Sequence, residues 1–171
     1  MGDINKLNKF IDTICSNSAA VLQTITNQQI SIDKKQTSGF DFDLISSQIE
    51  IPGILLTVNF SKDETFQMSI FINKTLVAAL ADLMMLGDGE VEYNPEEHND
   101  ALQEMFNQIL GSVTAELSGE GISLNGVVNQ VELTDMDIQR EFMADNTMAE
   151  INFEMMGKEQ SMFFLFDSDA M

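Results

Sequence analysis

The sequence predicts an α+β domain with internal pseudo-symmetry, in which an antiparallel sheet is backed by two long helices and one shorter helix. Apolar side chains recur at helical spacing near the start of the chain and again beyond residue 95. Runs rich in β-branched and aromatic residues follow each of these helices. The stretch ISI after the first helix is also echoed by ISL after the later one. We therefore expect a single domain over 1–171, built from two halves at about 1–92 and 93–171.

The first half is expected to begin with a helix over residues 4–26, where Leu7, Phe10, Ile11 and Ile14 share one face. Strand-like stretches follow at 30–33, 40–47, 53–60 and 65–72, and SKDE at 61–64 has the composition of a hairpin connection. A shorter helix is expected over 74–86. Asn73 would open it, and Gly87 would close it in the left-handed conformation.

The second half is expected to begin with a long helix from about residue 95 to 118. Asn94 is a favoured capping residue, and Pro95 occupies a position where its missing N–H has no cost. Glu96 and Glu97 complement the positive end of the helix dipole. Strands are then expected at 121–133, 148–156 and 161–166, with an acidic irregular stretch at 134–146 and a turn at Gly157-Lys158.

Composition excludes several classes of function. The formal charge of −20, with no cluster of Lys or Arg, makes binding to nucleic acid or to anionic membranes unfavourable. No apolar run approaches the roughly 20 residues of a transmembrane segment, and the first residues lack the apolar core of a signal peptide. A single cysteine, Cys15, lies in an apolar helical stripe and is expected to be a buried thiol. Cytoplasm is the expected compartment.

The long helix carries an unusual polar stripe. On a helical wheel, one side collects the apolar residues Leu102, Phe106, Ile109, Leu110, Val113 and Leu117. The opposite side collects Glu104, Asn107, Gln108, Gly111 and Ala115. Asn and Gly are poor helix formers, and small residues beside a carboxylate and an amide would let another surface approach closely. On spacing alone, the favoured interpretation is that Glu104 and Asn107 are ordinary exposed side chains and that Gly111 packs against a strand.

Two blocks of sequence change this interpretation. ALADLMMLGDG at 79–89 and DALQEMFNQILGS at 100–112 resemble the CheC/CheX/FliY family of chemotaxis phosphatases and flagellar motor-switch proteins, most closely its FliY branch. In that family a helix carries [D/S]-x-x-x-E-x-x-N followed by Gly-Ser, and this chain supplies Asp100, Glu104, Asn107 and Gly111-Ser112. The resemblance implies a CheC-like fold and a protein that binds the phosphorylated response regulator CheY and promotes hydrolysis of its aspartyl phosphate.

The resemblance also implies roles for individual residues. Asn107 would orient the attacking water, and Glu104 would dock the active site of the regulator by pairing with its lysine. Asp100, Gln108, Gly111 and Ala115 would contact the partner. No cofactor or metal of its own is expected, because the regulator supplies Mg²⁺. The flagellar switch proteins FliM, FliN and FliG are further expected partners, which would place the chain at the cytoplasmic face of the flagellar motor.

Departures from the family pattern leave alternatives open. The first helix has no E-x-x-N, and its nearest candidate pair is Asp12 with Cys15, so one site at most is expected. No proline follows Pro95, whereas the family has one beyond the Asn. The alternatives are a non-catalytic flagellar switch adaptor whose phosphatase site has decayed, and an acidic scaffold domain. Since the FliY branch continues into a further domain, the chain is expected to be either part of such a protein or a stand-alone relative.

The histidine and two acidic pairs are expected to have ordinary surface roles. His98, the only histidine, is expected to be a surface residue in the first turn of the long helix. The acidic pairs Asp135/Asp137 and Asp167/Asp169 lack the spacing of a calcium loop and are expected to be solvated.

Overall fold

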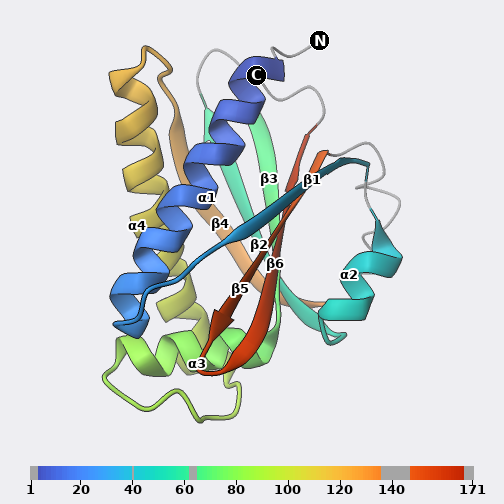
Figure 1. The fold of residues 1–171 in the computed structure, drawn as a ribbon, viewed down its shortest axis with the longest axis vertical. Helices are drawn as coiled ribbons and strands as arrows, with labels where there is room; N and C mark the ends of the chain where they lie inside the picture. Colours follow the sequence, from blue (N-terminus) through green and yellow to red (C-terminus); the bar gives the residue numbers. More distant parts are fainter. Residues whose placement is uncertain (1–3, 40, 62–64, 136–146, 168–171) are drawn as a thin grey trace.

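A computed structural model of the chain describes residues 4–39, 41–61, 65–135 and 147–167. Within these ranges it contains four helices and six strands (Figure 1). In chain order the elements are α1 Ile4–Thr26, β1 Asp33–Ser38, α2 Phe42–Gln48, β2 Gly53–Ser61, β3 Thr65–Ile72, α3 Lys74–Met84, α4 Pro95–Gly119, β4 Asn125–Thr134, β5 Thr147–Met155 and β6 Lys158–Phe166.

The six strands form one antiparallel sheet in the order β1-β5-β6-β3-β2-β4. The hairpins β2–β3 and β5–β6 meet at its centre, where β3 pairs with β6. The strands after the two long helices, β1 and β4, lie at the two edges, and each pairs with a strand of the other half. This exchange confirms the predicted α+β class and the predicted pseudo-symmetry. The division of the chain near residue 92 stays a prediction.

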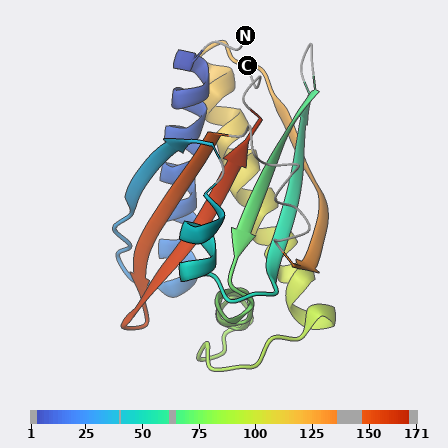
Figure 2. The ribbon, with the colours of Figure 1, turned by 90° about the vertical axis from the view of Figure 1, so that its right-hand side faces the viewer.

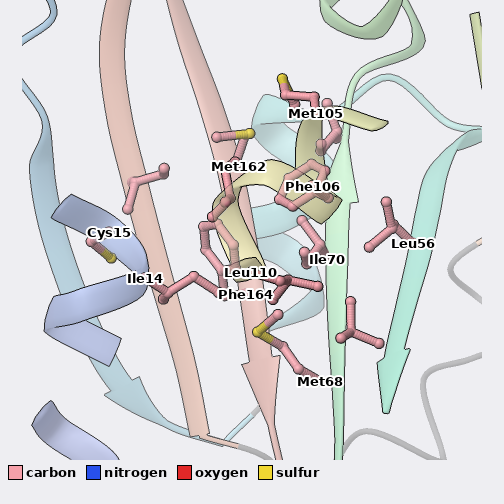
Figure 3. Close-up of a cluster of buried hydrophobic side chains, with 14 of the residues drawn as sticks. Ile14, Cys15, Leu56, Met68, Ile70, Met105, Phe106, Leu110, Met162 and Phe164 are labelled. Carbon is pink, nitrogen blue, oxygen red and sulfur yellow. The ribbon is translucent and has the colours of Figure 1, made fainter. Parts of the chain in front are cut away.

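The two long helices cover one face of the sheet. Figure 1 shows α1 and α4 side by side on that face, α3 across one end, and α2 on the opposite face. Seen from that opposite face, α2 lies in front of the sheet and the long helices behind it (Figure 2). The main core lies between helices and sheet. In Figure 3, Phe106 and Leu110 of α4 face Ile70 and Phe164 of the sheet, and Ile14 of α1 completes the contact.

A short helix, α2, replaces the strand that the sequence predicts at 40–47. The alternation of Phe42 and Leu44 with aspartates resembles a strand, but the Asp41 carboxylate accepts a hydrogen bond from the Leu44 N–H at 2.9 Å and caps a helix. Ile45 and Ile49, four residues apart, then bury their side chains on the outer face of the sheet, which is the face opposite α1 and α4 (Figure 2). The strand prediction was wrong because the local alternation gave no sign of this tertiary contact.

Other predicted boundaries differ in detail. The strand expected at 30–33 begins only at Asp33. At the end of α3 it is Leu86, with φ of 65°, that adopts the left-handed conformation, and not Gly87. Gly87 donates its N–H to the Asp82 carbonyl at 2.8 Å, and a Cβ there would lie 2.0 Å from the Asp82 carboxylate. The β5–β6 turn is formed by Met156 and Gly157, both with positive φ, since Lys158 already belongs to β6.

Several predicted features fall wholly or partly outside the described residues. These are most of the hairpin connection at 61–64, most of the irregular stretch at 134–146, and one member of each acidic pair, Asp137 and Asp169. The helix over residues 4–26 and the strands over 53–60 and 65–72 are confirmed.

Candidate functional site

The start of α4 is fixed by its own sequence. The Asn94 side chain accepts a hydrogen bond from the Glu96 N–H at 3.1 Å, and Pro95 occupies the first turn, as predicted. His98 was expected at the surface but is only 3% exposed. Its Nδ1 accepts the Asn94 N–H at 3.0 Å, and its ring packs against Tyr93. The histidine therefore satisfies a backbone donor at the helix start, which the spacing of apolar residues did not reveal.

The rest of α4 divides into a buried and an exposed side. Its apolar residues Leu102, Met105, Phe106, Ile109, Leu110, Val113 and Leu117 are all buried in the main core. Full burial of a side chain such as Phe106 contributes roughly 1.5–3 kcal/mol, so this side holds the helix against the sheet. The opposite side is therefore fixed in position without needing contacts of its own.

The predicted polar stripe lies on the exposed side. We call it the α4 stripe, and it consists of Asp100, Glu104, Asn107, Gln108, Gly111 and Ala115, all of them exposed. Within it, the Gln108 amide donates to the Glu104 carboxylate at 3.4 Å. A Cβ added at Gly111 would meet no atom within 4 Å, so Gly111 does not pack against a strand. The structure brings all the predicted site residues together on one open surface, while their functional roles stay predictions.

Helix α1 flanks the stripe without covering it. The Asn17 amide donates to the Glu116 carboxylate at 3.1 Å. Lys9 forms an ion pair with Glu120 at 3.0 Å, and this hydrogen bond raises the pKa of Lys9. Both contacts lie at the border between the two helices, so α1 is held beside α4 and the α4 stripe remains open.

Helix α1 does not present the pair considered in the sequence. Asp12 is exposed and forms an ion pair with Lys34 of β1. Cys15 is 6% exposed, and burial raises the pKa of its thiol to about 11. A thiol that is buried and protonated cannot orient a water molecule at the surface, so Asp12 and Cys15 do not form a second site.

In the described part of the chain, no three side chains of His, Cys, Asp or Glu come together to hold a metal ion. In the same residues, every helix is too short or too polar to traverse a bilayer.

Sequence reasoning missed a second polar cluster on the other face of the sheet. Gln48, Glu150, Asn152 and Ser161 are joined there by hydrogen bonds. The available signal was the placement of Glu150 and Asn152 at alternate positions within the strand MAEINFEM, in which the intervening residues are apolar. Period-two placement predicts that both side chains lie on the same face.

Comparisons with known proteins agree with this architecture. No family model matches the sequence. The flagellar motor switch phosphatase FliY of Bacillus subtilis is 30% identical over 104 residues, which are 59% of this chain and 27% of that protein. The chain thus spans about a quarter of the length of the curated relative that it matches.

Solved structures share the fold. FliY of Thermotoga maritima superposes with a TM-score of 0.72 at 23% identity, covering 96% of this chain and 89% of that one. CheX of Vibrio vulnificus gives 0.65 at 15% identity, covering 93% and 99%. A chain from the FliG–FliM complex of H. pylori gives 0.67 at 13% identity, covering 96% and 92%. The chain is thus similar in sequence to part of FliY of Bacillus subtilis, and it shares its fold with these FliY, CheX and FliG–FliM complex structures.

Proposed function

We propose that the chain binds phosphorylated CheY and promotes hydrolysis of its aspartyl phosphate at the α4 stripe. The observation that supports this most strongly is the joint exposure of Glu104 and Asn107, one turn apart, on a helix whose other side is buried. FliY of Bacillus subtilis, to which the chain is similar in sequence, is named as a flagellar motor switch phosphatase, and this similarity supports the proposed activity.

The chemistry needs few groups from this chain. Water attacks the phosphorus, the bond between phosphorus and the aspartyl oxygen breaks, and the products are inorganic phosphate and the free carboxylate of the regulator. The regulator supplies Mg²⁺, so catalysis here consists of positioning. The Asn107 amide can donate and accept hydrogen bonds without any change of protonation, and it would hold the water in line with the breaking bond.

Glu104 would hold the partner. Its carboxylate would pair with the lysine of the regulator, and Gln108, which donates to it at 3.4 Å, would help to orient it. Gly111 and Ala115 continue the stripe without large side chains, which leaves room for the partner surface. Asp100 extends the negative charge one turn towards the start of the helix.

The proposal is tested by following the decay of phosphorylated CheY with the wild-type chain and with Asn107→Ala. Loss of water positioning should reduce the stimulated decay by about 10- to 100-fold. A matched control is Asn59→Ala, since Asn59 is an exposed asparagine of β2 on the α2 side of the sheet. We expect this control to behave as wild type. Equal decay with Asn107→Ala and wild type at saturation would remove the proposed activity.

A second candidate is a non-catalytic adaptor of the flagellar switch. It is favoured by the shared fold with a chain from the FliG–FliM complex of H. pylori. In this case the chain would bind FliM, FliN or FliG at the cytoplasmic face of the motor and leave the lifetime of phosphorylated CheY unchanged. Binding of purified switch proteins without any effect on the decay rate would identify this function.

A further inference from the structure

A hollow of about 570 Å³ is lined by Gln48 of α2 together with residues of β1, β5 and β6. Helix α2 lies on the face of the sheet opposite α1 and α4 (Figure 2). Four of its lining residues are acidic, Asp33, Glu150, Glu154 and Glu159, and one is basic, Lys35. An excess of carboxylates in a concave site favours a cationic ligand. Because the hollow is separate from the α4 stripe, a ligand there is independent of the proposed phosphatase activity.

Glu150 is the unusual member of this lining, since its side chain is only 2% exposed. One carboxylate oxygen, Oε1, accepts hydrogen bonds from the amides of Gln48 and Asn152, both at 2.9 Å. No donor among the described residues reaches the other oxygen, Oε2. Ser18 Oγ is the one side-chain polar atom of the described residues that is both sealed from solvent and without a hydrogen bond. Oε2 of Glu150 therefore keeps some contact with solvent. Glu150 is therefore a largely buried carboxylate, held through Oε1, whose Oε2 can accept a hydrogen bond from a ligand.

Beside Glu150, the Ser161 hydroxyl faces two acceptor oxygens but has one hydrogen to donate. The Ser161 hydroxyl lies within hydrogen-bond distance of the side-chain oxygens of both Gln48 and Asn152. A hydroxyl has a single proton, so it can donate to only one of them. Rotating the side-chain amide of Gln48 or Asn152 by half a turn would give Ser161 a donor, but it would remove one of the two donors to Glu150. One of the two amide oxygens therefore receives no hydrogen bond from these four side chains.

We propose that this hollow binds an alkylammonium group. A single ammonium carries three N–H donors, which suits the free Glu150 oxygen together with the unsatisfied amide oxygen. A guanidinium is less suitable, because bidentate pairing needs both carboxylate oxygens and Oε1 is already occupied. The ammonium of Lys35 does not occupy the position of the proposed ligand, because Lys35 is exposed and forms no ion pair with a carboxylate of the described residues.

The test is a titration of the ¹⁵N-labelled chain with n-butylammonium, followed by NMR. Side-chain amide signals of Gln48 and Asn152 should shift and saturate, whereas tetramethylammonium, which has the same charge and no N–H, should leave them unchanged. Glu150→Gln should weaken binding by about tenfold or more. The matched control Glu97→Gln removes the same charge from an exposed position in the first turn of α4 and should bind as wild type.

A second variant keeps the proposal testable if Glu150→Gln does not fold. Lys35→Ala changes an exposed position on the edge strand β1 and should tighten binding about two- to threefold, because it removes a positive charge from the lining. Stronger binding of n-butylammonium than of Nα-acetyl-lysine methylamide would indicate a diffusible amine, and the reverse would indicate a lysine of a partner protein. Equal shifts with tetramethylammonium, or full binding by a folded Glu150→Gln, would overturn the proposal.

Discussion

Gly111 offers a test that separates the stability of α4 from its proposed use as a docking surface. Glycine in the interior of a helix costs about 1 kcal/mol relative to alanine. A Cβ at Gly111 would meet no atom within 4 Å, so Gly111→Ala gains this propensity without a clash. For a domain of this size we expect the melting temperature to rise by about 2–4 °C.

The same substitution should weaken binding of the regulator. If a partner contacts the backbone at Gly111, an added methyl group must be accommodated in a close-packed interface, at a cost of about 1–3 kcal/mol. This corresponds to a dissociation constant raised roughly 5- to 150-fold. Thermal unfolding measures the first effect, and titration with CheY activated by beryllofluoride measures the second.

Gly119→Ala is the matched control. Gly119 is the last residue of α4 and is equally open, but it lies two turns beyond Gly111, away from Glu104. We expect it to leave the affinity for CheY unchanged. Destabilisation by Gly111→Ala would show that its surroundings are not open. A more stable chain with unchanged affinity would show that the regulator does not dock on this part of the α4 stripe.

Three further predictions concern the fold. At pH 8 the Cys15 thiol should react with iodoacetamide about 100-fold more slowly in the native chain than in urea, because its pKa is about 11 against an ordinary 9.0. The reaction rate of the native chain should rise about tenfold per pH unit up to that pKa. Equal rates in the native and unfolded chains would contradict the burial of Cys15. Asp41→Ala removes the side-chain cap of α2 and should lower the free energy of unfolding by about 1 kcal/mol in urea titrations. Phe106→Ala should lower it by about 3–5 kcal/mol, and a loss below 1 kcal/mol would contradict the packing of α4 on the sheet.

Local sequence patterns were sufficient for the parts of the fold that depend on near neighbours. The apolar period of α1 and the cap formed by Asn94 and Pro95 are decided within a few residues, so both helices were predicted from spacing. The same wheel that predicted the buried side of α4 also predicted its exposed stripe. The site was therefore accessible to sequence reasoning to the extent that it lies on one helix.

Features that depend on distant contacts were not predictable in this way. Helix α2 forms where Ile45 and Ile49 meet the outer face of the sheet, and the alternation of its first residues indicated a strand. The hydrogen bond between Gln48 and Glu150 joins residues 102 positions apart, so no local pattern shows that Glu150 is buried beside an amide. His98 similarly depends on a contact with the Asn94 backbone that periodicity does not describe.

The most direct test of the account is the dependence of phosphorylated CheY decay on the concentration of this chain, measured for wild type, Asn107→Ala and Glu104→Ala. If Asn107 orients water and Glu104 holds the partner, Asn107→Ala should lower the maximal rate without changing the half-saturating concentration. Glu104→Ala should mainly raise the half-saturating concentration. Decay that is no faster with the wild-type chain than without it, in the presence of demonstrated binding, would contradict the catalytic role of the α4 stripe.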